Sequence, residues 1–283
     1  MSKFFDETQK ARLWAPAVPE TGQLDVVSVM DAIKQSEALT ADEVVVGPID
    51  RPEIEAEKPI RGPIKIHDGD HPSSAPAIEA YGSLRTRVMR LQASKGICSL
   101  MLTSSVPSEG KTLTSLNLAL SYAKLHNLRI LLVDGDLRSR GMTRLLKIPE
   151  GPGLSDYLGG KFTVDKTVLP TEHDNLFVLG AGSLNGQPSE LFASLLWSEF
   201  IRWASQAYDI VMVDAPPLLS FSDAELISAG CDGVLFVVRA LSTPREIAQK
   251  CISRLDKRKL VGIVFNGLAS SPASDYPYYG SSS

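Results

Sequence analysis

The stretch Ser105-Val-Pro-Ser-Glu-Gly-Lys-Thr112 lies between a short apolar run and a segment with helical periodicity. The run before it, Cys98-Ser-Leu-Met-Leu-Thr103, has the length of a strand, and Leu113, Leu116 and Leu120 after it recur at the spacing of a helix face. Strand, loop and helix in this order are the context of a phosphate-binding loop. The stretch therefore predicts that the chain binds a nucleoside triphosphate, and a chance Gly-Lys-Thr at a strand–helix turn is the alternative.

Each position of this loop has an expected part in binding a nucleoside triphosphate. Backbone N–H groups and the dipole of the following helix would attract the phosphates. Gly110 allows close backbone approach, Lys111 can reach the terminal phosphates, and the Thr112 hydroxyl can ligate Mg²⁺. Ser105 departs from the usual pattern, which has a glycine there. The expected nucleotide-binding residues are Ser108, Glu109, Gly110, Lys111, Thr112, Leu113 and, at the end of a later strand, Asn266.

Two further apolar runs end in carboxylates. Continuous apolar residues suit strands buried on both faces of a parallel sheet, whose carboxyl ends form the ligand-binding edge. One run ends at Asp134 and continues into Asp136, a pair that suits water-mediated magnesium binding or a general base. A solvated Asp-Gly-Asp turn is the alternative. The other run ends at Asp214, which would hold magnesium through water. Asn266 also ends a run, where it could contact the base or form a turn.

Strand-like and helix-like segments alternate from residue 77 to residue 268. This alternation predicts one α/β domain with a mainly parallel sheet and helices on both faces. The sequence predicts strands at 98–103, 129–134, 175–180, 208–214, 233–239 and 260–266, and helices at 78–91, 113–126, 189–207 and 244–255. Thr243 is the expected N-cap of the last helix, with Pro244 in its first turn.

Composition narrows the class of protein. The 283 residues are 43% hydrophobic and 22% charged, which is ordinary for a globular protein. No apolar run approaches the roughly 18 residues of a membrane span. The amino terminus has no signal-peptide core, and the three cysteines show no paired spacing, so we expect buried thiols and a cytoplasmic location. The four histidines show no metal-binding spacing, and a net charge of −4 argues against a nucleic-acid partner.

Residues 1–76 differ in composition from the rest. The first 77 residues hold 14 acidic and 8 basic side chains and 8 of the 18 prolines. This composition predicts a mostly disordered arm. Residues 24–39 are an exception, because their apolar side chains recur at helical spacing. That segment could be a docking helix for a partner, or a helix folded against its own domain.

The last segment, residues 269–283, cannot form a core, yet it is rich in tyrosine. Tyr276, Tyr278 and Tyr279 are three of the seven tyrosines in the chain. Aromatic residues are scarce in disordered segments. A flexible tail that carries tyrosines can enter the active site of its own or of a neighbouring subunit, which suggests that the tail is phosphorylated.

Together, these features resemble the bacterial tyrosine autokinases of capsule and exopolysaccharide synthesis, in the form whose catalytic domain is a separate chain. That family lies within the deviant Walker ATPases, which include the division-site and plasmid-partition ATPases. The resemblance covers about residues 77–280. It is carried by the Walker A match 105–112, the second carboxylate motif 130–138, Walker B 210–214, the supporting matches 153–158, 188–191, 222–224 and 243–246, and the tyrosine tail.

The resemblance implies ATP-dependent autophosphorylation of the tail tyrosines, with Mg²⁺. Lys111 would neutralise the transferred phosphoryl group, Thr112 would ligate magnesium directly and Asp214 through water. Asp134 would accept the proton of the tyrosine hydroxyl, and Asp136 would assist the metal. The resemblance also implies a membrane chain-length regulator, or polysaccharide co-polymerase, as activator, which would recruit the chain to the inner face of the plasma membrane.

The chain departs from the family in its oligomerisation helix. The family pattern is Glu-x-x-Arg-x-x-Arg, and here it is Glu79-Ala-Tyr-Gly82-Ser-Leu-Arg85, with Gly82 in place of the middle arginine. A homo-oligomer is implied, weakened at this contact. Two other functions stay open: a partition-type ATPase switch without tyrosine transfer, and a weakly catalytic ATP-binding scaffold.

Overall fold

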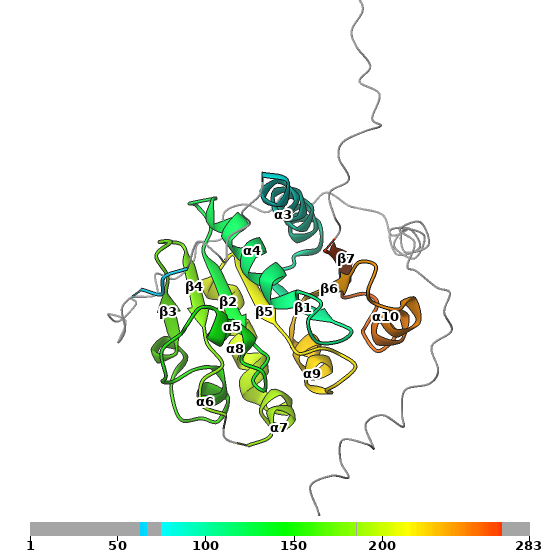
Figure 1. The fold of residues 1–283 in the computed structure, drawn as a ribbon. Coiled ribbons are helices and arrows are strands. Elements are labelled where there is room, and N and C mark those ends of the chain that lie inside the picture. Colours follow the sequence, from blue (N-terminus) through cyan, green and yellow to red (C-terminus); the bar gives the residue numbers. More distant parts are fainter. Residues whose placement is uncertain (1–62, 67–74, 185, 268–283) are drawn as a thin grey trace, which may run out of the picture.

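The computed structural model describes residues 63–66, 75–184 and 186–267 (Figure 1). The possible docking helix at 24–39 and the three tail tyrosines lie outside the described residues. Their expected roles therefore stay predictions.

A sheet of seven strands forms the centre of the described chain, in the order β3-β4-β2-β5-β1-β6-β7 (Figure 1). Neighbouring strands are parallel except for β3 and β4, which are antiparallel. The strands are β1 Ser99–Ser104, β2 Ile130–Asp134, β3 Val168–Pro170, β4 Leu176–Leu179, β5 Ile210–Asp214, β6 Gly233–Arg239 and β7 Leu260–Asn266. The predicted mainly parallel sheet is confirmed, and all six predicted strands are present. The three-residue β3 was not predicted, because it is too short to show a pattern.

Helices cover both faces of the sheet, as predicted. They are α3 Ala75–Lys95, α4 Lys111–Ala123, α5 Gly141–Leu145, α6 Leu154–Leu158, α7 Pro188–Ala193, α8 Leu195–Ala207, α9 Asp223–Gly230 and α10 Arg245–Ile252, with a 3₁₀ turn at Val164–Lys166. The single helix expected at 189–207 is two helices, because Ser194 between them has extended backbone angles (φ −72°, ψ 158°). Helices α5 and α9 were not predicted.

Strand residues alternate between two hydrophobic layers. In β1, Leu100 and Leu102 pack with side chains of α3, α4 and α5, whereas Met101 packs with side chains of α6 to α10. This period of two is that of a strand whose side chains point to opposite faces. Strands β1, β2 and β5 are buried along their whole length, as expected for the centre of a parallel sheet.

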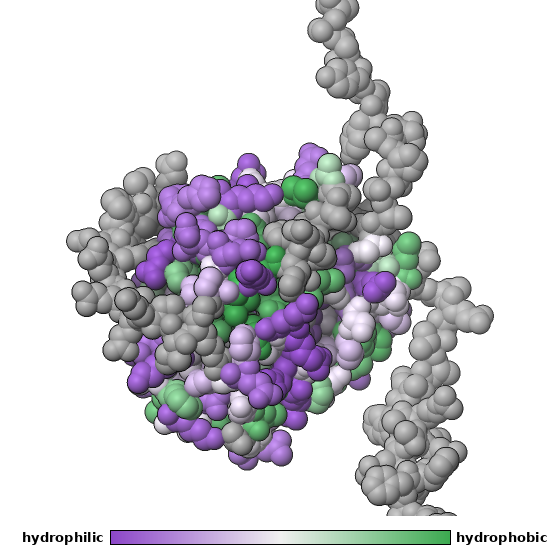
Figure 2. All heavy atoms as spheres, turned by 60° about the vertical axis from the view of Figure 1, so that its left-hand side comes forward, coloured by the Kyte–Doolittle hydropathy of each residue, from purple (hydrophilic) through white to green (hydrophobic). Residues whose placement is uncertain are grey.

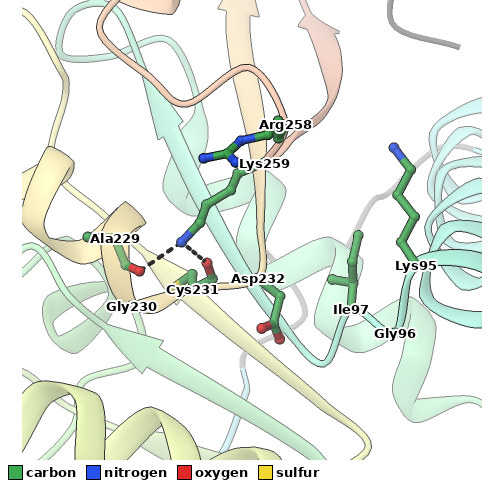
Figure 3. Close-up of a pocket in the computed structure, with 9 residues that line it drawn as sticks. All are labelled: Lys95, Gly96, Ile97, Ala229, Gly230, Cys231, Asp232, Arg258 and Lys259. Carbon is green, nitrogen blue, oxygen red and sulfur yellow. Dashed lines mark hydrogen bonds between the residues drawn. The ribbon is translucent and has the colours of Figure 1, made fainter. Parts of the chain in front are cut away.

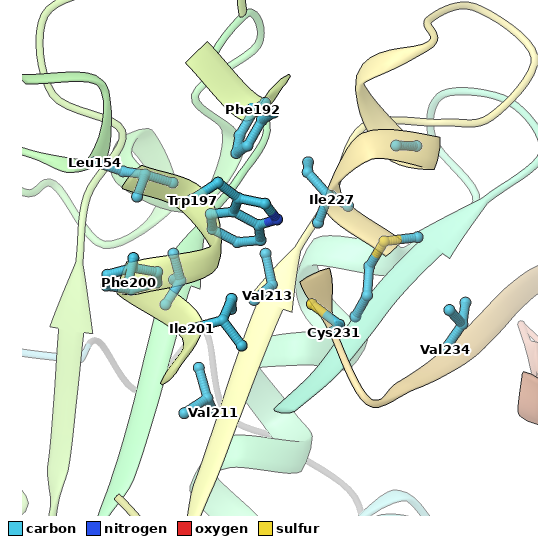
Figure 4. Close-up of a cluster of buried hydrophobic side chains, with 14 of the residues drawn as sticks. Leu154, Phe192, Trp197, Phe200, Ile201, Val211, Val213, Ile227, Cys231 and Val234 are labelled. Atoms are coloured by element: carbon cyan, nitrogen blue, oxygen red, sulfur yellow. The ribbon is translucent and has the colours of Figure 1, made fainter. Parts of the chain in front are cut away.

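A group of aromatic side chains supports β5 from one face (Figure 4). Trp197 stacks on Phe200 with ring centroids 5.6 Å apart, and Phe192 meets Trp197 edge-on at 5.1 Å. Helix α9 lies close to this group, because a Cβ atom on Gly230 would be 2.4 Å from Trp197 Nε1. The aromatic layer thus fixes α8 and α9 behind the strand that carries Asp214.

Part of the expected disordered arm belongs to the folded domain. Ile64 N–H donates to the carbonyl of Pro170 (2.9 Å), and Glu172 N–H donates to the carbonyl of Ile64 (3.0 Å). Ile64 and Ile66 are each only 5% exposed and join the core layer on the α4 side. The proline-rich composition concealed two apolar residues at strand spacing, so the domain begins before residue 77. Helix α3 likewise begins at Ala75.

The surface on the side of β3 is largely hydrophilic over the described residues, as Figure 2 shows with that side turned forward. Within the described ranges, none of the helices has the length and apolar character needed to cross a bilayer.

Candidate active site

The loop between β1 and α4 has the backbone geometry of an anion site. Gly110 has φ 93°, and a Cβ atom there would lie 1.9 Å from Asn266 Nδ2, so only glycine fits. No side chain caps α4, and its first helical hydrogen bond runs from Thr114 N to the Gly110 carbonyl (2.9 Å). The N–H groups of residues 111–113 therefore remain available for phosphate oxygens.

Glu109 holds this loop in shape from inside. Its side chain is 2% exposed, and its Oε2 accepts a hydrogen bond from Val106 N (2.8 Å). Its Oε1 accepts a hydrogen bond from the Thr243 hydroxyl, and its carbonyl accepts one from Asn266 Nδ2 (2.9 Å). The Glu109 side chain thus faces away from the phosphate position, and only its backbone N–H can serve a nucleotide.

The expectations for three residues around this loop need adjustment. Thr243 is not the N-cap of α10, since the cap is Pro244 and the Thr243 hydroxyl is committed to Glu109. The amide nitrogen of Asn266 donates one hydrogen bond to the loop, so contact with the base is left to its oxygen or to its second N–H. Leu113 has a 47% exposed side chain, and its place in the nucleotide site would rest on its backbone N–H.

Lys111 lies between carboxylates from two strand ends. Its Nζ is 3.1 Å from Asp136 Oδ2 and 3.5 Å from Asp214 Oδ1, and its side chain is 10% exposed. Burial lowers the pKa of Lys111, but the attraction of Asp214 and Asp136 outweighs it and holds that pKa above its usual value. The ammonium is therefore charged at neutral pH.

Thr112 and Asp214 meet at the bottom of the site. The Thr112 hydroxyl donates to Asp214 Oδ2 at 2.7 Å, and Asp214 is fully buried. Burial raises the pKa of the Asp214 carboxyl, although Lys111 and the hydrogen bond from Thr112 oppose the rise. In the pairing of β2 with β5, Asp214 lies opposite Asp134. Thr112, Asp134 and Asp214 therefore lie at the same end of the sheet, as predicted.

Asp134 and Asp136 have different surroundings. Asp134 Oδ2 accepts hydrogen bonds from Thr143 N (2.7 Å) and Thr143 Oγ1 (2.6 Å), while its Oδ1 is buried without a hydrogen-bond partner among the described residues. Burial, and then Asp214, raise the pKa of Asp134 to about 7. Burial also acts on Asp136, but Lys111 and the Ser139 N–H (3.1 Å) hold its pKa below the usual value.

The donor set suits a magnesium–nucleotide complex better than a free metal. In the part of the chain that the structure describes, no cluster of three or more His, Cys, Asp or Glu side chains could hold a metal ion. Magnesium in nucleotide sites keeps several waters and takes other ligands from the phosphates, with few from the protein. Thr112 beside Asp214, with Asp136 joined to Asp214 through Lys111, meets that need.

A pocket lies at the amino-terminal ends of β1, β6 and β7, away from the strand ends that carry Asp134 and Asp214 (Figure 3). It has a volume of about 450 Å³. Two of the charged side chains that line it, Lys259 and Asp232, are used in hydrogen bonds that hold neighbouring chain segments together. The Lys259 ammonium donates to the carbonyls of Ser228, Ala229 and Cys231 at 3.0, 2.7 and 2.8 Å. Asp232 Oδ2 accepts bonds from Cys98 N and from both Ser99 N and Oγ. The strand-end carboxylates and Lys111 are not part of it.

Known proteins with similar sequences share one activity in their names. Tyrosine-protein kinase YwqD of Bacillus subtilis is 33% identical over 204 residues, which cover 71% of this chain and 86% of that protein. This chain belongs to the bacterial tyrosine-protein kinases. The putative tyrosine-protein kinase CapB of Staphylococcus aureus is 30% identical, with 94% of its length covered. The tyrosine-protein kinase wzc of Salmonella typhimurium is 36% identical, but the match spans only 29% of that longer protein. No family model matches the chain.

Solved structures agree with this family. The kinase domain of the Escherichia coli tyrosine kinase ETK superposes with a TM-score of 0.66 at 29% identity, over 71% of this chain and 80% of that one. The chimerical protein CapA2B2 gives a TM-score of 0.63 at 29% identity, over 69% and 85%. The septum site-determining protein MinD of Pyrococcus horikoshii, at 19% identity and a TM-score of 0.51, shares the fold. The predicted kinase family and its MinD-like fold are therefore confirmed.

Proposed function

We propose that this tyrosine kinase uses ATP with Mg²⁺ and phosphorylates Tyr276, Tyr278 and Tyr279 of its own tail. The observation that carries the proposal is the position of Lys111 at the uncapped start of α4, with its ammonium 3.1 and 3.5 Å from carboxylates of two strand ends. A phosphate group placed there would meet backbone N–H groups, a charged ammonium and the positive end of a helix dipole.

The residue roles follow from this arrangement. Lys111 and the loop N–H groups would bind the transferred phosphoryl group, so Lys111 would have to exchange part of its contact with Asp136 for the phosphate. Thr112 would ligate Mg²⁺ directly, Asp214 would hold it through water, and Asp136 would assist. The metal would supply charge neutralisation of the phosphates. Because phosphoryl transfer depends mostly on positioning and electrostatics, these few side chains can suffice.

Asp134 is the proposed proton acceptor. In the reaction, a bond forms between the tyrosine oxygen and the γ-phosphorus, the bond from that phosphorus to the β–γ bridging oxygen breaks, and ADP leaves. The hydroxyl proton passes to the Asp134 carboxylate. Asp134 suits this role better than Asp136, because its Oδ1 has no hydrogen-bond partner among the described residues whereas Asp136 is paired with Lys111. A pKa near 7 supports the assignment, since an efficient base titrates near the working pH.

The biological setting is proposed from the names of relatives. One of them, from Klebsiella pneumoniae, is a putative tyrosine-protein kinase in a cps region, 32% identical to this chain. We propose that the chain regulates capsule or exopolysaccharide polymerisation and export. A membrane chain-length regulator would activate it and bring it to the inner face of the plasma membrane. Subunits would associate through α3, more weakly than in relatives because Gly82 replaces an arginine of the motif.

The central test is the site of phosphate transfer. The purified full chain is incubated with ATP and magnesium, and phosphate is located by mass spectrometry of its peptides. We expect phosphate on one or more of the three tail tyrosines, and none in Lys111→Met. Lys124→Met, at the exposed position directly after the end of α4, is the matched control and should be labelled like the unchanged chain.

Other outcomes would favour the other functions. Magnesium-dependent ATP hydrolysis without any protein label would favour an ATPase switch of the partition type. Neither activity, with ATP binding retained in a calorimeter, would favour a scaffold. A label that persists in Lys111→Met would contradict the proposed site.

A further inference from the structure

Thr143 makes two bonds to one oxygen of Asp134. It lies on the short helix α5 and is 6% exposed. Its backbone N–H and its hydroxyl donate to Asp134 Oδ2 at 2.7 and 2.6 Å. Hydrogen bonds to an ionised acceptor are the stronger kind, so the pair holds this carboxylate firmly when it is charged.

The Thr143 hydroxyl also has a partner on its acceptor side. The backbone N–H of Ala181, just after β4, donates to Thr143 Oγ1 at 2.9 Å. A hydroxyl has one proton to donate, and an acceptor bond from Ala181 leaves that proton to Asp134. The bond from Ala181 thus restrains the hydroxyl oxygen from the side of β4, while its one proton is donated to Asp134.

The segment after β4 is itself held in place. Asp156 Oδ2 accepts hydrogen bonds from Gly153 N (3.1 Å) and Ser183 N (3.0 Å), and the Ala181 carbonyl accepts from Ser155 Oγ at 2.7 Å. The segment that orients Thr143 is thus joined to α6 by several bonds. A rigid support of this kind is what keeps a reactive group in one geometry.

These contacts leave one oxygen of Asp134 for chemistry. Both bonds from Thr143 end on Oδ2, and Oδ1 is buried with no hydrogen-bond partner among the described residues. Without Thr143, the carboxyl group could rotate and exchange its two oxygens. With it, Oδ1 has one fixed position at the sheet edge, in the register where Asp134 lies opposite Asp214.

We propose that Thr143 is a positioning residue for tyrosine phosphorylation: it holds Asp134 Oδ2 so that Oδ1 alone receives the proton of the acceptor tyrosine. The proposal rests on the function proposed above for Asp134. It adds a residue that touches neither nucleotide nor acceptor and acts through the carboxylate.

The test compares Thr143→Val with Thr143→Ser in the full chain. Valine keeps the shape of the side chain but removes the hydroxyl, whereas serine keeps the hydroxyl. Because a small misplacement of a catalytic group can cost about 100-fold, we expect kcat for phosphotyrosine formation on an acceptor peptide to fall roughly 10- to 100-fold in Thr143→Val. We expect the KM for ATP to stay within about twofold, and Thr143→Ser to recover most of the rate.

A matched control separates positioning from general stability. Thr167 is fully buried and its hydroxyl donates to the Val164 carbonyl at 2.7 Å, away from the carboxylates. Thr167→Val should lower the melting temperature about as much as Thr143→Val but leave kcat unchanged. Equal loss of kcat in the two variants, or no rescue by serine, would show that Thr143 is only structural.

A double variant ties the effect to Asp134. If Thr143 acts through Asp134, the double variant Asp134→Asn/Thr143→Val should be no slower than Asp134→Asn alone. Once the Asp134 carboxylate has been replaced, Thr143 has nothing left to position, so its removal should cause no further loss. A further loss in the double variant would overturn the proposal. Failure of the proposed function is recognised separately, because the unchanged chain would then form no phosphotyrosine at all.

Discussion

Asp134 and Asp214 lie directly opposite each other in two neighbouring parallel strands, and both are fully buried. Two carboxylates enclosed so close together could not both remain charged without compensation. Asp214 has a cation at 3.5 Å and a hydroxyl at 2.7 Å, whereas the hydrogen bonds to Asp134 from the described residues all come from Thr143. The sheet register thus creates one carboxylate suited to a metal complex and one suited to exchange a proton.

The pH dependence of the reaction should show the raised pKa of Asp134. Below its pKa of about 7 the carboxyl group is protonated and cannot accept the tyrosine proton. We therefore expect kcat/KM for an acceptor peptide to rise with pH and to level off above about 7, since this ratio reports the free enzyme. Asp134→Asn should be slower at every pH and lack this rise. A flat profile in the unchanged chain would contradict the assignment.

The same carboxyl group should make the folded state less stable as pH rises. Its pKa is raised on folding from an ordinary 3.8 to about 7, so the folded chain binds the proton more tightly. The contribution of this carboxyl group to the free energy of unfolding is fully present below about pH 4 and is lost as the pH rises to about 7. Asp134→Asn should therefore have a higher melting temperature than the unchanged chain at pH 8. This difference in melting temperature should shrink or reverse near pH 5.

The Glu109–Thr243 contact should govern ATP affinity. Thr243→Val removes the hydroxyl donor from a carboxylate that is 2% exposed, and an unsatisfied buried acceptor costs about 1–3 kcal/mol. Because Glu109 shapes the loop, we expect the dissociation constant for ATP, measured by calorimetry, to rise about tenfold or more. The exposed neighbour Ser242→Ala is the control and should bind ATP normally. Unchanged affinity in Thr243→Val would show that the loop keeps its shape without this bond.

Much of the position of this site could be predicted, because it follows from the order of strands, loops and helices along short stretches of the sequence. A strand–loop–helix motif and strands that end in carboxylates must meet at one edge of a parallel sheet. Lys111, Thr112, Asp136 and Asp214 are accordingly linked by direct contacts. The position of each motif could be predicted from a few consecutive residues, and the chemistry assigned to it stays a prediction.

What could not be predicted depends on partners far apart in the chain. Glu109 and Thr243 are 134 positions apart, and the local pattern at Thr243 favoured an N-cap, which the long-range hydrogen bond replaced. Thr143 lies on a five-residue helix without a periodic signal. Ile64 lies in a proline-rich region whose average composition indicates disorder, although two apolar residues suffice to join it to the core.

The aromatic layer behind β5 should carry a large share of stability. Phe200 is fully buried and contacts the rings of Tyr157, Trp197 and Trp203 at centroid distances of 5.9, 5.6 and 6.1 Å. Phe200→Ala should lower the free energy of unfolding by about 3–5 kcal/mol, measured by urea denaturation. Phe162→Ala, at a 42% exposed position, should cost far less. Similar losses in both variants would mean that this layer is not the stabilising core.

Gly82 allows the association of subunits to be tested directly. A Cβ atom at this position meets nothing within 4 Å, so α3 can take a larger side chain without strain in the subunit. Replacing a helical glycine should itself stabilise the helix by about 0.5–1 kcal/mol. Gly82→Ala and Gly82→Arg share this gain, but only arginine restores the family pattern between Glu79 and Arg85. We expect Gly82→Arg, but not Gly82→Ala, to shift sedimentation towards larger species. We also expect tail phosphorylation in Gly82→Arg to increase with protein concentration. The same sedimentation for both variants would indicate that the subunits do not associate through this helix face.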